Sequence, residues 1–228
     1  MTKIAIIPAR GGSKRIPRKN IKSFLGKPII AYSIEAALQS KLFDEVMVST
    51  DDAEIAEIAL FYGAKVPFLR SEVNANDFAT TIDVLREVVS KYQEINCDFD
   101  EICCLYPTAP FVTAEKLRTT VQLFQETKVN SLLPVVKFGF PIQRAFEVNG
   151  SKIQYKFEEF KNARSQDLKP CFHDAGQFYW LKKEVLQENS IVTNNTGYFE
   201  ISEMESQDID TLSDWKLAEL KYELLQNA

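Results

Sequence analysis

The sequence contains one histidine, His173, and only four cysteines, which form no Cys-x-x-Cys pair. Cys97, Cys103, Cys104 and Cys171 therefore lack the spacing and the nearby histidine that zinc sites use. No apolar run approaches the ~20 residues that cross a bilayer, and no signal-peptide core precedes the first predicted strand. We expect a cytoplasmic protein without disulfides and without a membrane partner.

Positive charge is also scarce. Lys and Arg number 27 against 32 Asp and Glu, so the formal net charge at pH 7 is −5. This balance argues against a general nucleic-acid-binding protein, which spreads basic residues over a whole face. Apolar residues make up 45% of the chain, which is enough for one hydrophobic core, so we expect a single domain over residues 1–228.

The positive charge that is present is concentrated in one loop, where five of the ten residues from Arg10 to Lys19 are basic. The loop follows the apolar run 4–7, and Gly11 and Gly12 let its backbone approach a ligand closely. On composition alone, this segment could also be a solvated basic loop that binds nothing. Because its cations can neutralise a triphosphate, we favour a nucleotide site. The loop is neither a Walker P-loop nor a dinucleotide-binding fingerprint.

Strands and helices alternate over the first part of the chain. We expect strands at 4–8, 45–50, 66–69, 101–106 and 131–136, and helices at 28–37, 52–61, 81–92 and 113–126. This alternation predicts a three-layer α/β fold, in which helices cover both faces of a mostly parallel, Rossmann-like sheet. Ligands of such sheets bind at the carboxyl ends of the strands, where the basic loop begins.

The alternation lapses over residues 138–172. An Asn149-Gly150 turn between 146–148 and 151–155 predicts a hairpin. We interpret this segment as a small inserted β element that covers the site or meets a partner subunit. A strand at 177–181 and a helix at 211–225 follow it.

Five segments together resemble the cytidylyltransferases that activate nonulosonic acids, the CMP-sialic acid synthetase group. They are residues 7–20, 26–34, 48–51, 106–110 and 208–211, and the resemblance runs over nearly the whole chain. It implies a nucleotidyltransferase fold, CTP as co-substrate, and a homodimer formed through the 138–172 element. It also implies that the nucleotide contacts a set of residues from the loop and two later segments: Arg10, Gly11, Gly12, Ser13, Lys14, Lys19, Asn20, Thr80, Thr81 and Tyr106.

The same resemblance implies the catalytic residues. It places Lys19 beside the α-phosphate, and it makes Lys19, Arg10 and Asp210 the residues that carry the reaction. Tyr106 stands where several relatives carry glutamine, and core packing is its alternative role. The two threonines of the nucleotide set also suit the N-cap of the helix that follows them.

Asp208 and Asp210 are candidates for a metal site. Two carboxylates two residues apart in an extended segment point the same way, and Mg²⁺ takes one or two carboxylates together with substrate phosphates. The pair also precedes the helix predicted at 211–225, where acidic residues commonly cap the helix and offset its dipole. The residues alone leave both roles open, and the resemblance implies that the pair binds the catalytic Mg²⁺.

A third cluster contains the candidate residues for a sugar acid: Arg164, Gln166, His173, Asp174 and Gln177. A lone histidine is more often structural than catalytic, but His173 lies beside an arginine-containing loop and just before a strand. Arg164 and His173 can bind a carboxylate. Asp174 and Gln177 can bond hydroxyl or acylamino groups.

The stretch at 173–180 reads His-Asp-Ala-Gly-Gln-Phe-Tyr-Trp and resembles the pseudaminic acid branch of the family, whereas sialate-type relatives read more like Asn-Gly-Ala-Ile-Tyr. It implies CMP transfer from CTP to the nine-carbon 2-keto sugar acid pseudaminic acid, with release of pyrophosphate. Sialic, legionaminic and 3-deoxy-octulosonic acids are alternative substrates. A non-catalytic nucleotide or phosphosugar sensor and a single-strand nucleic-acid module are alternatives from other classes, and the acidic charge disfavours the latter.

Overall fold

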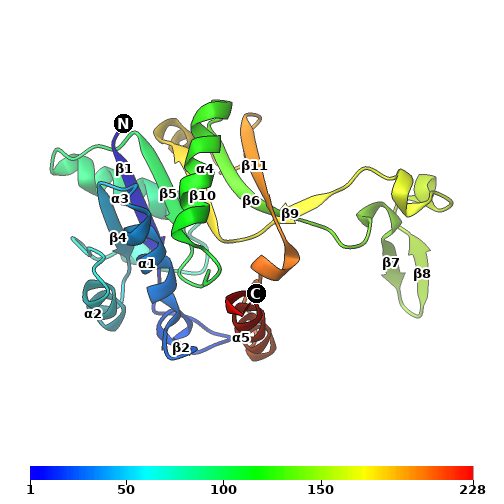
Figure 1. Cartoon of the computed structure of the whole chain (residues 1–228), viewed down its shortest axis with the longest axis horizontal. Coiled ribbons are helices and arrows are strands. Elements are labelled where there is room, and N and C mark those ends of the chain that lie inside the picture. The colour runs from blue at the N-terminus through cyan, green and yellow to red at the C-terminus, as the bar shows by residue number, and fades with distance from the viewer. Residues whose placement is uncertain (228) are drawn as a thin grey trace.

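A seven-stranded sheet forms the centre of the molecule in the computed structural model, which describes residues 1–227 (Figure 1). The strand order is β11-β6-β10-β5-β1-β4, and β9 pairs with β6 outside this path. The strands are β1 (Lys3–Pro8), β4 (Glu45–Ser49), β5 (Glu101–Leu105), β6 (Ser131–Lys137), β9 (Phe172–Asp174), β10 (Phe178–Lys182) and β11 (Thr196–Ile201). Only β9 and β10 run against the common direction, so the expected α/β fold with a mostly parallel sheet is confirmed.

Helices cover both faces of this sheet. On one face lie α1 (Ile29–Ser40), α2 (Ala53–Phe61) and α4 (Ala114–Thr127), packed around Ala5 and Ile7 of β1. On the other face α3 (Thr81–Glu94) packs over Ile4 and Ile6, because successive side chains of a strand point to opposite faces. A separate apolar cluster seats α5 (Leu212–Gln226). The three layers expected from the alternation are therefore present.

Among residues 1–227, side-chain caps start four of the five α-helices, where the polar residue before each apolar pattern satisfies an otherwise unpaired amide. The N-cap residues are Asp52 for α2, Thr80 for α3, Thr113 for α4 and Thr211 for α5. Thr80 and Thr211 belong to capping boxes that are completed by Asp83 and Asp214. The helix boundaries therefore follow from local hydrogen bonding as well as from packing.

Short elements connect the layers. Two pairs of residues form a small hairpin, β2 (Ser23–Phe24) with β3 (Lys27–Pro28). The 3-10 helices in the described part of the chain are η1 (Lys19–Ile21), η2 (Glu72–Asn74), η3 (Ile142–Arg144), η4 (Glu158–Phe160), η5 (Ser165–Asp167), η6 (Lys183–Gln187) and η7 (Glu203–Glu205). Among residues 1–227, every helix is too short or too polar to cross a membrane.

The prediction of a strand at 66–69 is wrong. Only the residue before it, Lys65, pairs with Met47 of β4, in an isolated bridge. Pro67 has no amide hydrogen to donate to a ladder, so the segment runs beside β4 without joining the sheet. It returns to the sheet edge at Arg70, whose amide donates to the Thr50 carbonyl at 2.8 Å.

Two strands of the sheet, β9 and β11, have no counterpart among the sequence predictions. β9 is three residues long, too short for any periodicity to register. β11 contains Gly197 and is half exposed, so its apolar alternation is weak. Both strands depend on pairing with β6, a partner far away in the sequence.

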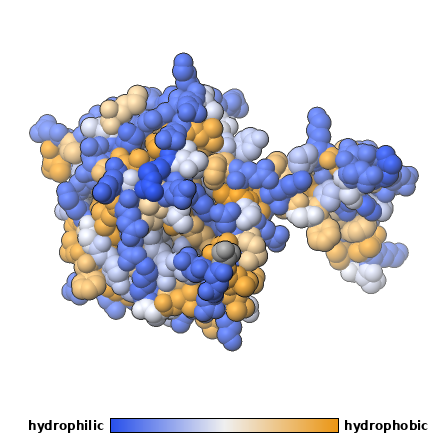
Figure 2. Space-filling view, viewed as in Figure 1, coloured by the Kyte–Doolittle hydropathy of each residue, from blue (hydrophilic) through white to orange (hydrophobic). Residues whose placement is uncertain are grey.

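Residues 138–171 form an arm that extends away from the body of the molecule (Figure 1). It carries the expected hairpin, β7 (Phe146–Asn149) and β8 (Lys152–Tyr155), with Gly150 in the left-handed turn at φ +60°. The space-filling view shows the arm as a separate lobe on which apolar and polar side chains are mixed (Figure 2). Apolar side chains of the arm that stand exposed are Phe140, Phe146, Val148 and Ile153.

Candidate active site

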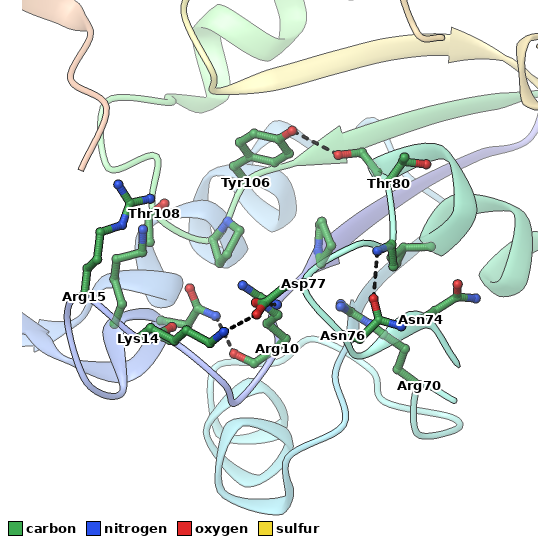
Figure 3. Close-up of a pocket in the computed structure, with 18 of the residues that line it drawn as sticks. Arg10, Lys14, Arg15, Arg70, Asn74, Asn76, Asp77, Thr80, Tyr106 and Thr108 are labelled. Carbon is green, nitrogen blue, oxygen red and sulfur yellow. Dashed lines mark hydrogen bonds and ion pairs between the residues drawn. The ribbon is translucent and has the colours of Figure 1, made fainter. Parts of the chain in front are cut away.

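A cleft of about 720 Å³ opens at the carboxyl ends of β1 and β5 (Figure 3). The basic loop after β1 forms one wall, and the segment from Arg70 to Thr81 forms the opposite wall. Tyr106 to Thr108, directly after β5, lies between them. The cleft is therefore at the edge of the sheet where parallel strands expose their ligand sites.

The basic loop is held in place by hydrogen bonds that the sequence does not reveal. The buried Asn20 donates through Nδ2 to the Arg10 carbonyl at 2.9 Å. The Gly11 amide donates to Asp51 Oδ1 at 2.9 Å, and the Ser13 amide donates to the Gly11 carbonyl. The amides of Gly11 and Ser13 are therefore engaged within the protein.

The cations of the loop divide into two groups. Arg10, Lys14, Arg15 and Lys19 line the cleft together with Ser13 and Asn20. Arg18 instead takes a left-handed backbone at φ 56° and forms ion pairs with Asp52 and Glu54 at the start of α2. These bonds lower the pKa of Asp52 to about 2. Arg18 therefore anchors the loop and does not line the cleft.

The acidic segment near the carboxyl end meets this loop. Lys19 Nζ donates to the Ile209 carbonyl at 2.7 Å and lies 3.9 Å from Asp210 Oδ1. Burial lowers the pKa of Lys19, and the nearby charges of Asp210 and Asp208 oppose that shift. Arg15 Nη2 also pairs with Asp210, at 2.7 Å. Residues almost two hundred positions apart in the chain thus form one charged centre.

The capping role considered for Asp208 and Asp210 is filled by other residues. Thr211 is the N-cap of α5 and Asp214 closes the capping box. Ile209 is buried in the apolar cluster under α5, while the two flanking carboxylates remain accessible. In residues 1–227 no group of three His, Cys, Asp or Glu is placed to hold a metal. Two carboxylates alone still suit Mg²⁺, which completes its shell with water and substrate oxygens.

Arg70 also lines the cleft and is not among the site residues that the sequence predicts. Its side chain is almost completely buried, donates from Nε to Ser49 Oγ at 3.1 Å, and also donates to the Ser49 carbonyl. Burial lowers its pKa. The signal that could have found it is the apolar run 66–69, which carries the chain along β4 and delivers Arg70 to the same sheet edge as the basic loop.

At Thr80 and Thr81 the second wall of the cleft meets Tyr106. Thr80 caps α3, as the simplest reading of the sequence expects. Thr81 Oγ1 lies 3.0 Å from the Tyr106 hydroxyl, and the Tyr106 ring packs edge-on against Tyr179. Burial raises the pKa of Tyr106. Tyr106 therefore packs in the core and also lines the cleft, and its contact with a nucleotide stays a prediction.

The candidate residues for the sugar acid do not line this cleft. His173 and Asp174 lie on β9, where His173 is exposed with its ring 5.0 Å from that of Phe138. Asp174 accepts from the Tyr179 hydroxyl at 2.7 Å and from the Gly176 amide at 2.8 Å. The buried Gln177 donates to the Glu205 carbonyl.

Arg164 and Gln166 are separated from the cleft by the length of the arm. They lie at its 3-10 helix η5, where Arg164 Nε donates to Asp167 Oδ2 at 2.8 Å. The five candidate residues therefore do not form one constellation around this chain's own cleft. The cause is the extended path of residues 138–171, which carries these two residues away from the sheet (Figure 1).

The fold and its charged cleft define a nucleotidyltransferase type of α/β protein. A solved structure of CMP:2-keto-3-deoxy-manno-octonic acid synthetase, determined with CTP, shares the fold at a TM-score of 0.72 and 21% identity, covering 100% of both chains. 4-Diphosphocytidyl-2C-methyl-D-erythritol synthase from Anaerococcus prevotii aligns at a TM-score of 0.64 and 14% identity, over 97% of this chain and 98% of that chain.

Sequence comparison then gives the family. The profile described as Cytidylyltransferase matches residues 4–223. A pseudaminic acid cytidylyltransferase of Campylobacter jejuni is 44% identical over 226 residues, 98% of this chain and 97% of the relative. CMP-N,N'-diacetyllegionaminic acid synthase of Legionella pneumophila is 36% identical, over 99% and 98%. The chain belongs to the cytidylyltransferase family, as the motifs of the basic loop indicate.

The close approach of Gly11 to Asp52 gives a stability prediction. A Cβ added at Gly11 would lie 2.6 Å from Asp52 Oδ2 and 3.0 Å from Asp52 Cβ. Because Asp52 is held by Arg18 and by the Ile55 amide, Gly11→Ala should lower the free energy of unfolding by about 1–3 kcal/mol. Urea unfolding monitored by circular dichroism measures this.

Gly12→Ala is the matched control for that measurement. A Cβ at Gly12 meets nothing within 4 Å, so its unfolding free energy should stay within about 0.5 kcal/mol of the parent protein. Equal stability of the two variants would show that the contact with Asp52 relaxes freely.

Proposed function

We propose that this protein transfers CMP from CTP to a nonulosonic acid, most specifically pseudaminic acid, and releases pyrophosphate. The observation that carries the proposal is the meeting of Lys19 with the Asp208–Asp210 segment beside a cation-lined cleft. Support for the acceptor comes from the relative named pseudaminic acid cytidylyltransferase, which is 44% identical over nearly the full length of both chains.

The reaction needs positioning and charge stabilisation more than a covalent intermediate. The anomeric hydroxyl oxygen of the sugar acid attacks the α-phosphorus and loses its proton to solvent, and the bond from the α-phosphorus to the bridging oxygen of the leaving pyrophosphate breaks in line. Lys19 is half-buried and already oriented by the Ile209 carbonyl, so it can donate to the α-phosphate without reorganising. Arg10 and Lys14 line the cleft and would stabilise charge on the leaving phosphates.

The acidic pair fits a magnesium ion. Asp208 and Asp210 would hold Mg²⁺, which supplies Lewis-acid stabilisation of phosphate charge when it is bound. Arg15 now pairs with Asp210 but is largely exposed, so its long side chain is free to turn toward the phosphates. Lys19 keeps its bond to the Ile209 carbonyl and therefore stays beside the carboxylates whichever partner Arg15 takes.

Pyrophosphate release tests the proposal directly. The purified protein is incubated with CTP, Mg²⁺ and one acid at a time: pseudaminic, legionaminic, sialic or 3-deoxy-octulosonic acid. We expect release to be fastest with pseudaminic acid and to be negligible when the sugar acid is omitted. A preference for legionaminic acid would keep the reaction class and replace the substrate. Release with none of the four would overturn the assignment as an enzyme of this group.

The metal assignment has its own prediction. Asp210→Asn removes one carboxylate charge while keeping the size of the side chain, so kcat with Mg²⁺ should fall by on the order of 100-fold. Asp98→Asn is the matched control, because Asp98 forms an exposed ion pair with Lys183 at the opposite end of β5. Parent-like turnover of Asp210→Asn, across a titration of Mg²⁺, would remove Asp210 from the metal site.

The arm supports a homodimer, which we also propose. Its hairpin exposes apolar side chains on both strands, and an isolated hairpin is marginally stable in water. Packing against a second copy would cover these side chains. The same arrangement would bring Arg164 and Gln166 to the cleft of the partner subunit, where they can bind the sugar acid.

Mixed dimers test this arrangement. Arg164→Ala and Asp210→Asn should each be poorly active alone, since each lacks part of every site. After unfolding and refolding as an equal mixture, half of the dimers would combine an intact cleft with an intact arm at one of their two sites. Activity should then recover to about a quarter of the parent value. No recovery, or a monomer in sedimentation, would contradict the shared site. The expected cytoplasmic location and the absence of nucleic-acid or membrane partners stay predictions.

A further inference from the structure

A carboxylate of the chain itself lies against the cations that line the cleft. Asp77 Oδ1 pairs with Arg10 Nη1 at 2.5 Å, and Asp77 Oδ2 pairs with Lys14 Nζ (Figure 3). These bonds lower the pKa of Asp77, with the hydrogen bond from Lys14 as the largest cause, so the group is ionised at neutral pH. Asp77 therefore takes the cations that phosphate oxygens would otherwise take.

The loop that carries Asp77 is fixed at both ends and turned at its tip. At its start, Glu87 of α3 accepts from the Ser71 amide and hydroxyl at 2.8 Å and from Asn74 Nδ2 at 2.6 Å. At its end, Thr80 begins α3. Between these anchors Asn76 Oδ1 accepts from the amides of residues 78 and 79, and this turn directs Asp77 across the cleft.

The tip of this loop has little else to hold it. Phe78 is 92% exposed and Val73 is 77% exposed, so moving the tip would give up little apolar burial. Behind the loop, a second groove of about 560 Å³ separates it from Asp83 and Arg86 of α3. Residues 74, 76 and 79 line both this groove and the cleft. The tip of the loop therefore lies between the cleft and the second groove, and the ion pairs of Asp77 hold it toward the cleft.

We propose that Asp77 is a built-in competitor of the nucleotide phosphates. In the unliganded protein it neutralises Arg10 and Lys14, the triphosphate displaces it into the space behind the loop, and its return helps to expel pyrophosphate. A triphosphate carries about four negative charges and the carboxylate carries one, so the triphosphate displaces Asp77 from the cations. Smaller anions displace it less completely. The inference rests on the proposed function, which makes phosphates the ligands of this cleft.

Calorimetric titration tests the competition without any catalytic step. Inorganic pyrophosphate is titrated into the full chain at fixed salt concentration, with and without Mg²⁺, because screening alters such affinities. Asp77→Asn keeps the shape but removes the charge, so pyrophosphate should bind about 5- to 10-fold more tightly than to the parent protein. Product inhibition by pyrophosphate should become stronger by a similar factor.

Two variants control for charge and for surface effects. Asp77→Glu retains the negative charge on the same loop and should keep parent-like affinity. Asp98→Asn removes an equivalent exposed carboxylate that is paired with Lys183 far from the cleft, and should also leave pyrophosphate binding unchanged. A gain in affinity shared by Asp77→Asn and Asp98→Asn would reflect net charge alone and would overturn the proposal.

The remaining outcomes are equally decisive. Unchanged or weaker pyrophosphate binding by Asp77→Asn would refute competition, and a loss confined to Mg²⁺-containing buffer would make Asp77 a metal ligand instead. These results are distinguishable from failure of the proposed function. If the parent protein binds pyrophosphate but forms no CMP-sugar, the function fails while competition is still measurable; if it forms CMP-sugar and Asp77→Asn binds as the parent does, only the competition fails.

Discussion

The bond from Lys19 Nζ to the Ile209 carbonyl joins the two charged segments on which the site depends. It ties the loop after β1 to the segment before α5, so the cations and the carboxylates are held within one centre. The cost of such an arrangement is that opposite charges neutralise one another when no ligand is bound, as Arg15 and Asp210 do. A nucleotide carrying both phosphates and a cation would satisfy the two sets of charges together.

The sequence predicts the frame of the molecule because the frame depends on local signals. Apolar period, capping residues such as Thr80, and the Asn149-Gly150 turn each act within a few residues of one another. The prediction of a strand at 66–69 is wrong because a short apolar run resembles a buried strand. Pro67 lacks the amide hydrogen that pairing with β4 would need. β9 and β11 escape prediction because only pairing with β6 stabilises them.

The site was predictable where residues of like chemistry are adjacent in sequence, and unpredictable where tertiary contacts decide. The basic loop is recognisable from its composition. The sequence does not show that Arg18, whose backbone is left-handed, pairs with Asp52 outside the cleft. Arg70 is a single cation whose role depends on burial beside Ser49. Asp77 lies in a polar loop whose sequence resembles a solvated surface loop, and only the tertiary structure shows its ion pair with Arg10. Arg164 is separated from the cleft by the extended arm, whose path the sequence does not predict.

The antiparallel strand β10 stands between β5 and β6 and so divides the sheet into two halves. The half built on β1, β4 and β5 carries the cation-lined cleft, while β9 and the arm carry His173, Asp174, Arg164 and Gln166, four of the candidate residues for the sugar acid. Mutations that reshape β9 or the arm leave the backbone ladder of the other half intact. If these residues bind the acid as proposed, selection can change which acid is accepted without rebuilding the cation-lined cleft, a modularity that suits a scaffold shared by enzymes of several different sugars.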